Sequence, residues 1–188
     1  MASSFEDIKG DPTRQALGSL QGYAYQIYAS TKAWIELKSN ETLFLEVAED
    51  YATAVGQAIN NVQVKNTGAS LTLNSAGARA AIESLVKLTA LNPNKCVNLR
   101  YLTTAQEGIE RSLVDKINGI GGIAYWRRAA QGADIQPLRA RLEAMALNEE
   151  TKSFINVRSD EELRGELVRR LIWDCEQVDL SVLIIAKN

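Results

Sequence analysis

The sequence predicts an α/β protein with a mixed central sheet flanked by helices and a helical C-terminal extension. A helical apolar periodicity opens the chain, short strand-like segments bounded by turn residues follow it, and helical patterns dominate after residue 104. Of the 188 residues, 46% are hydrophobic and 23% are charged, which is the balance of a globular chain with a buried core.

The N-terminal part gives helix and strand signals in turn. Residues 1–13 are polar, and we expect them to form a loose, flexible leader. Apolar residues at helical spacing predict a helix from about Gln15 to Lys38, and Thr42–Ala48 has the composition of a strand. Residues 55–57 (Val-Gly-Gln) are typical of a hairpin turn, which predicts a return strand over Ala58–Lys65.

A second helix and a further strand complete the predicted core. The apolar stripe of residues 75–91 predicts a helix, which Asn92 and Pro93 end, and Cys96–Thr103 is typical of a buried strand. The resulting order is helix, three strands, helix, strand, and we expect a right-handed crossover into the last strand.

Helical patterns dominate the C-terminal part. Helices are predicted over Glu107–Asn118, over Ile123–Ala130 and from Pro137 to Ala146. Residues 159–162 form a capping box, and the apolar stripe after it predicts a helix that reaches Leu171.

Composition excludes several kinds of chemistry. No histidine is present, which excludes histidine-based triads and His-ligated zinc. The two cysteines, Cys96 and Cys175, are too few for a four-cysteine zinc site and are typical of free thiols in a reducing compartment. No secretory signal or membrane-spanning run is visible, so we expect a cytoplasmic protein without membrane contact. The net charge of −2 still allows a local basic surface.

Asp50 and the return strand are the main candidates for chemistry. Asp50 follows the first predicted strand, and alternation places Gln63 and Lys65 on one face of the return strand. Asp50 could hold Mg²⁺, with the Gln63 side-chain oxygen or the Val64 carbonyl as a further ligand. Lys65 could then orient a water or stabilise charge during phosphodiester hydrolysis. A carboxylate beside an ammonium group is also an ordinary structural pair, and both interpretations stay open on spacing alone.

These residues resemble a known signature. Residues 22–26 (Gly-Tyr-Ala-Tyr-Gln), 46–50 (Glu-Val-Ala-Glu-Asp) and 63–65 (Gln-Val-Lys) are similar, in this order, to the D…(D/E)xK pattern of the restriction-endonuclease-like PD-(D/E)xK superfamily. More narrowly, the QxK form resembles the N-terminal nuclease domain of bacterial anti-phage defence effectors. The clear resemblance covers about residues 15–105.

The resemblance implies a role for each matched residue. Asp50 would be the principal metal ligand, and Gln63 would be a second ligand at a position where the family more often has an acid. Lys65 matches the lysine of the signature. Gln26 takes the place of a helical glutamate and could touch a metal-bound water.

Two further acids are auxiliary candidates for the metal site. Strand alternation places Glu46 on the face of Asp50 and Glu49 on the other face, unless a bulge changes the alternation.

Arg127 and Arg128, beside Trp126, could contact phosphates or simply form a solvated helix face.

The resemblance implies a Mg²⁺-dependent DNA endonuclease, for which Mn²⁺ could replace Mg²⁺. It would act as an effector domain in anti-phage defence, and we expect its DNA substrate to be double-stranded. Residues 14–105 would be the nuclease core, and residues 106–188 would be a mostly helical extension. The apolar segment 180–185, near the last residue, suggests the hypothesis that this extension leads to a downstream domain. Expected partners are further copies of the chain and a fused or associated sensor or ATPase domain. The alternative is a catalytically silent nuclease-fold module for nucleic-acid binding or oligomerisation, and RNA stays open as the substrate.

Overall fold

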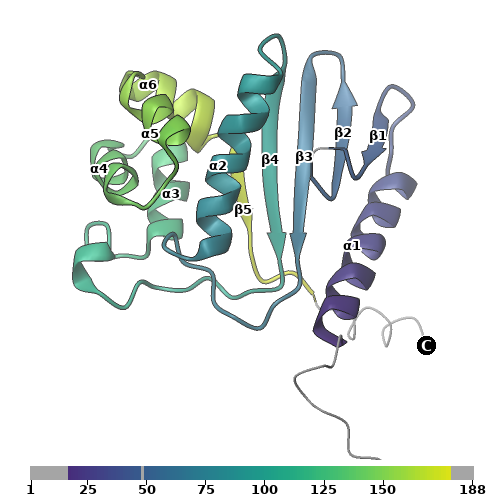
Figure 1. Cartoon of the computed structure of the whole chain (residues 1–188), viewed down its shortest axis with the longest axis horizontal. Coiled ribbons are helices and arrows are strands. Elements are labelled where there is room, and N and C mark those ends of the chain that lie inside the picture. Colours follow the sequence, from purple (N-terminus) through teal and green to yellow (C-terminus); the bar gives the residue numbers. More distant parts are fainter. Residues whose placement is uncertain (1–16, 48, 179–188) are drawn as a thin grey trace, which may run out of the picture.

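A computed structural model of the chain describes residues 17–47 and 49–178 (Figure 1). The predicted leader and the apolar segment 180–185 lie outside these residues. A five-stranded sheet forms the centre, with its strands in the order β1-β2-β3-β4-β5. The predicted class, an α/β fold with a mixed sheet flanked by helices, is confirmed.

The strands are β1 (Thr42–Leu45), β2 (Tyr51–Val55), β3 (Ala58–Lys65), β4 (Cys96–Thr103) and β5 (Leu171–Asp174). The first three form an antiparallel meander, and β4 runs parallel to both β3 and β5. The predicted order of helix, three strands, helix and strand is confirmed. In the register between β2 and β3, Tyr51, the first residue of β2, pairs with Val62, so Asp50 directly precedes the paired part of β2.

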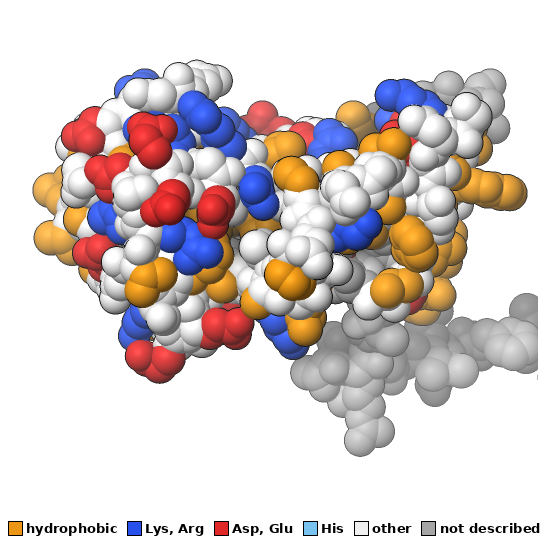
Figure 2. All heavy atoms as spheres, turned by 90° about the horizontal axis from the view of Figure 1, so that it is seen from above, with side chains coloured by type: hydrophobic (Ala, Val, Ile, Leu, Met, Phe, Trp, Pro, Cys, Tyr) orange, Lys and Arg blue, Asp and Glu red, His pale blue; other side chains and the backbone are white. Residues whose placement is uncertain are grey.

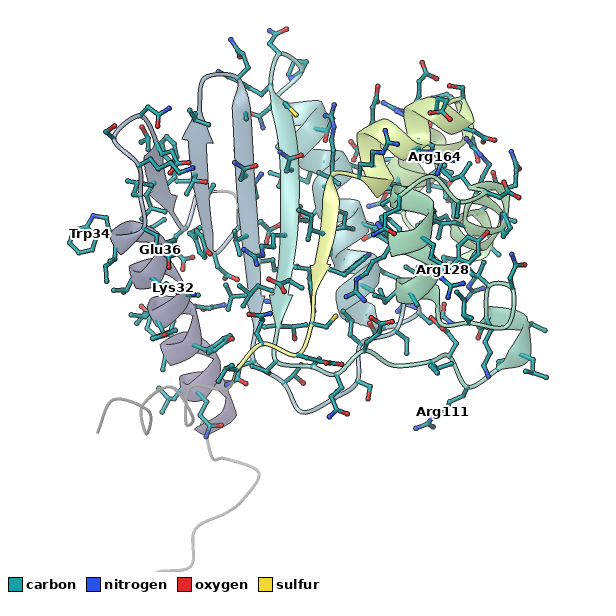
Figure 3. The ribbon with its side chains drawn as sticks, turned by 180° about the vertical axis from the view of Figure 1, so that it is seen from behind. Lys32, Trp34, Glu36, Arg111, Arg128 and Arg164 are labelled. Atoms are coloured by element: carbon teal, nitrogen blue, oxygen red, sulfur yellow. The ribbon has the colours of Figure 1, made fainter. Side chains whose placement is uncertain are left out.

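Helix α1 (Leu17–Ile35) packs on one face of the sheet at its β1 edge. Tyr25 and Ala29 contact a small cluster made by Tyr51, Val62 and Val64. In the part of the chain that the structure describes, no helix covers β4 and β5 on this face (Figure 3). This side of the sheet is therefore held by a much smaller core than the other.

The remaining helices lie on the other face and beyond β5 (Figure 1). They are α2 (Ala76–Leu91), α3 (Gly122–Ala130), α4 (Gln136–Ala144), α5 (Glu149–Asn156) and α6 (Asp160–Leu163). Their apolar side chains form one large core with β4 and β5, and Leu85, Leu99 and Trp126 are almost fully buried in it. Residues before and after 105 therefore share one sheet and one core. None of the described helices is both long and apolar enough to span a membrane.

Several predicted boundaries agree closely with the structure. Ser75 caps α2 by accepting a hydrogen bond from the Ala78 amide, and β3 and β4 have the predicted limits. The capping box is also present, because the Ser159 side chain accepts from the Glu162 amide while the Glu162 carboxylate accepts from the Ser159 amide. Strong local signals thus fixed these ends.

Three predictions were wrong. The strand expected over Thr42–Ala48 ends at Leu45, where the chain turns into β2. The helix expected over Glu107–Asn118 is a loop with one short 3₁₀ helix, Leu113–Asp115. The helix expected to reach Leu171 passes into a π-helical turn over Arg164–Val168, and the chain then forms β5 beside β4.

Glu110 joins the loops that follow β3 and β4. Its carboxylate is only 3% exposed and accepts hydrogen bonds from the amides of Leu73 (3.0 Å) and Gly122 (2.9 Å). A Cβ atom on Gly122 would lie 2.6 Å from that of Leu73, so the close approach requires glycine at the start of α3. This junction holds the loop after Lys65 against the main core.

Candidate functional site

Asp50 lies in the irregular turn between β1 and β2. Glu46 adopts a left-handed backbone conformation (φ 54°), and its amide donates to the Asp50 carbonyl over 3.2 Å. The alternation that placed Glu46 on the face of Asp50 assumed a strand through residue 48 and does not apply to this turn. The Glu46 side chain is exposed.

Two hydrogen bonds fix the Asp50 carboxylate. Gln26 of α1 donates from Nε2 to Oδ1 over 2.8 Å, and the Val64 amide of β3 donates to Oδ2 over 2.6 Å. The second bond places the carboxylate against the β3 backbone between Gln63 and Lys65. Because a carboxylate offers about four lone-pair positions, both oxygens can still take a further ligand.

Gln63 presents an oxygen without a partner. Val62 and Val64 pack towards α1, so strand alternation directs the Gln63 side chain to the face that carries α2. Its Oε1 atom is shielded from solvent and accepts no hydrogen bond from any described residue. Four other buried side-chain atoms in the described residues share this property, but none of them belongs to a neighbour of the Asp50 carboxylate. A buried acceptor of this kind needs a donor or a cation to offset its desolvation.

Lys65 is half-buried and shares the face of Gln63. Among the residues that the structure describes, none forms a hydrogen bond or an ion pair with its ammonium group, although its charge acts on Glu49. The ammonium group is therefore available for an anionic ligand.

Glu49 lies on the α2 side of the site. Its Oε1 accepts a hydrogen bond from the hydroxyl of Ser84 in α2. Burial raises the pKa of Glu49, the Ser84 hydrogen bond lowers it, the charge of Asp50 raises it, and the charge of Lys65 lowers it, with a net rise. Residues 46, 47, 49 and 50 lie in bends outside both strands, so the strand alternation that placed Glu49 on the face opposite Asp50 does not apply here.

The structure thus joins Gln26, Asp50 and the Val64 amide by hydrogen bonds, while Gln63 and Lys65 flank Val64 in β3 with their side chains on the α2 face. Their action as a metal site stays a prediction. The structure does not bring in the Glu46 side chain. Sequence reasoning missed Ser84, which sits in the middle of a helix and has no local pattern that would indicate its contact with Glu49. Arg127 bonds Glu107 and the Trp173 carbonyl, so it ties a loop to β5 rather than forming a free phosphate contact.

In comparisons with known proteins, the chain matches no protein-family model, no curated protein and no solved structure. The site itself is therefore the basis for a functional proposal.

Proposed function

We propose that this chain is a metal-dependent DNA endonuclease whose site is formed by Asp50, Gln63 and Lys65. The observation that carries the proposal is the Val64–Asp50 hydrogen bond of 2.6 Å, which seats a carboxylate on β3 between Gln63 and Lys65. Asp50 therefore lies beside β3 at the level of Gln63, whose amide oxygen has no hydrogen-bond partner, and of Lys65, which has no ion-pair partner among the described residues. That combination suits a cation and a phosphate.

The residues fit Mg²⁺, with Mn²⁺ as a substitute. This ion prefers hard oxygen ligands, and Asp50 and Gln63 supply two such oxygens, with the Val64 carbonyl as a further candidate. The buried Gln63 oxygen without a partner is the acceptor that a cation would satisfy. When bound, Mg²⁺ would neutralise the scissile phosphate and lower the pKa of the attacking water.

The surrounding side chains prepare the site. Gln26 fixes the orientation of the Asp50 carboxylate from α1, which reduces the entropy lost when a ligand binds. Lys65 would lie beside the phosphate and stabilise the negative charge that develops on it during hydrolysis. One amide in place of an acid leaves the site less negative, which suits a nuclease that acts only when assembled.

Assembly of several copies is part of this proposal, since two sites side by side could cut both strands. Orange, apolar side chains gather at the end of the molecule that holds α1 and β1, whereas charged side chains gather over the helices at the other end (Figure 2). Trp34 on α1 is 67% exposed and points away from the sheet (Figure 3). Other exposed apolar residues of this end are Leu20, Tyr23, Ile27, Ile35, Phe44 and Leu45.

The wider role rests on the resemblance of the sequence alone. We propose an effector domain of a bacterial anti-phage defence protein, associated with a sensor or ATPase domain and acting on double-stranded DNA in the cytoplasm. A catalytically silent module that binds nucleic acid or oligomerises is the second candidate, favoured by the amide at Gln63, which removes one negative ligand.

Plasmid cleavage with Mg²⁺ or Mn²⁺ tests the proposal. Asp50→Asn and Lys65→Ala should each lower the rate by about 100-fold or more, because each removes a charge from the reacting centre. Lys87→Ala, at an exposed lysine of α2, is the matched control and should cut like the wild type. A rate that rises more steeply than protein concentration would indicate assembly. Metal-independent cutting, or equal cutting by all variants, would contradict the proposed site, and DNA binding without cutting would favour the silent module.

A further inference from the structure

Glu49 occupies the face of the site that lacks a carboxylate. Gln63 and Lys65 point to the α2 side of the sheet, while the Asp50 carboxylate is drawn towards α1 by Gln26. Glu49 reaches the α2 side, because its carboxylate contacts Ser84 in α2. Glu49, which follows β1, therefore lies on the same side of the sheet as the side-chain amide of Gln63.

The contacts of Glu49 leave part of its carboxylate open. Oε1 accepts the Ser84 hydroxyl, and Oε2 makes no hydrogen bond with any described residue. Glu49 directly precedes Asp50 in the chain, and the charges of Asp50 and Lys65 both act on it. No arginine or lysine forms an ion pair with Glu49 within the described ranges 17–47 and 49–178.

Such an arrangement is costly unless a further group joins it. Two neighbouring carboxylates repel one another, and the partly buried position of Glu49 adds a desolvation cost. The buried Gln63 oxygen, on the same side of the sheet as the Glu49–Ser84 contact, also lacks a donor among the described residues. A divalent cation would offset both costs at once.

We infer that Glu49 is a second acidic ligand of the proposed metal site and supplies, from the turn before β2, the negative charge that Gln63 does not carry. This inference rests on the proposed function and names a residue for it. Ser84 would be a positioning residue, because it holds one oxygen of Glu49 and leaves the other free. With Glu49 included, the donor set is two carboxylates and one amide oxygen, a set that suits Mg²⁺ or Mn²⁺.

Direct binding of Mn²⁺ to the full chain tests the inference without relying on cleavage. Free Mn²⁺ is followed by electron paramagnetic resonance as protein is titrated, and the fold of each variant is checked by circular dichroism. Glu49→Gln should weaken Mn²⁺ binding by at least roughly tenfold, because ligand charge sets the affinity of such sites. Ser84→Ala should weaken it less, since Glu49 itself remains.

Glu46→Gln is the matched control. Glu46 lies three residues earlier in the same turn, carries the same charge and is exposed, so its replacement should leave Mn²⁺ affinity within about twofold of the wild type. Equal losses for Glu46→Gln and Glu49→Gln would overturn the inference, because the effect would then be only one of net charge.

Two other outcomes separate the inference from the function on which it rests. If Asp50→Asn loses Mn²⁺ binding while Glu49→Gln binds like the wild type, Glu49 is not a ligand and the proposed site stands without it. If the wild type binds no Mn²⁺, the proposed metal site and the inference both fail.

Discussion

Two parts of the molecule hold a buried or half-buried glutamate, but the groups around the two carboxylates differ. At the junction of the loops after β3 and β4, Glu110 is almost fully buried and accepts two backbone amides, from Leu73 and Gly122. In the turn before β2, Glu49 is half-buried, accepts one hydroxyl and lies beside the like charge of Asp50.

The difference indicates what each carboxylate is for. Glu110 has a structural role, because its carboxylate supplies acceptors for two backbone amides that would otherwise be buried without a hydrogen bond. Glu49 accepts one hydrogen bond from the described residues, and burial, together with the charge of Asp50, raises its pKa. Electrostatic costs of this kind gather at sites that bind ligands, where a later partner offsets them.

The largest effect is expected at the junction. Glu110→Ala leaves the amides of Leu73 and Gly122 buried without an acceptor, so the free energy of unfolding should fall by about 2–4 kcal/mol. Urea denaturation followed by circular dichroism measures it. Glu143→Ala, at an exposed glutamate of α4, is the control and should change the free energy by less than about 0.5 kcal/mol. Equal losses for both variants would mean that Glu110 does not hold the junction.

Local patterns predicted the elements whose ends are set by their own residues. Ser75 caps α2, Asn92 and Pro93 end it, and the alternation of β3 was sufficient to place Gln63 and Lys65 on one face. The same alternation, together with the turn at residues 55–57, predicted that Asp50 would meet β3. This part of the site follows from hairpin geometry alone.

Long-range contacts decided what the sequence could not predict. Residues 107–118 have apolar residues at helical spacing, yet Leu113 and Val114 are exposed, because Glu110 must point inward to reach Leu73 and Gly122. Strand β5 forms because β4 offers a free edge for Leu171–Asp174, which the apolar stripe before it does not reveal. The left-handed backbone at Glu46 has no glycine to signal it, and the contact of Glu49 with Ser84 joins residues 35 positions apart.

A smaller effect, of opposite sign, is expected at Glu49. Because its pKa in the folded chain is raised above the usual value of glutamate, the folded state binds more protons than the unfolded state, and stability falls as the pH rises through this window. The stability cost of the Glu49 charge is fully present above the pKa of Glu49 in the folded state and absent below its pKa in the unfolded state. In the absence of metal, the free energy of unfolding of Glu49→Gln should therefore rise relative to that of the wild type as the pH increases from about 4 to about 7.

Urea denaturation in the presence of a chelator at both pH values measures this difference. Glu46→Gln is again the control, because the exposed Glu46 shares the turn with Glu49 without sharing its contact with Ser84. If the gap between Glu49→Gln and the wild type stays constant with pH, burial beside Asp50 does not cost the chain stability, and the contrast with Glu110 loses its electrostatic basis.

The smallest effect is expected at a third glutamate, which is exposed and well partnered. The hydroxyl and the amide of Ser159 both donate to the Glu162 carboxylate and lower its pKa. Glu162 therefore stabilises α6 above its unfolded pKa, and this contribution is lost as the pH falls through the lowered folded pKa. Glu162→Gln should lower the urea midpoint slightly at about pH 7 and leave it unchanged at about pH 2.

The sign of this third change sharpens the comparison. Glu162 and Glu49 each accept a serine hydroxyl, yet the pKa of Glu162 is lowered and that of Glu49 is raised. Glu49 is half-buried and lies beside the charge of Asp50, whereas Glu162 is exposed, also accepts the Ser159 amide and lies near the charge of Arg158. Opposite slopes of stability against pH in the two glutamine variants would therefore assign the cost at Glu49 to its surroundings. Slopes of the same sign would show that a serine partner outweighs burial at both positions, and Glu49 would then be a structural acid like Glu162.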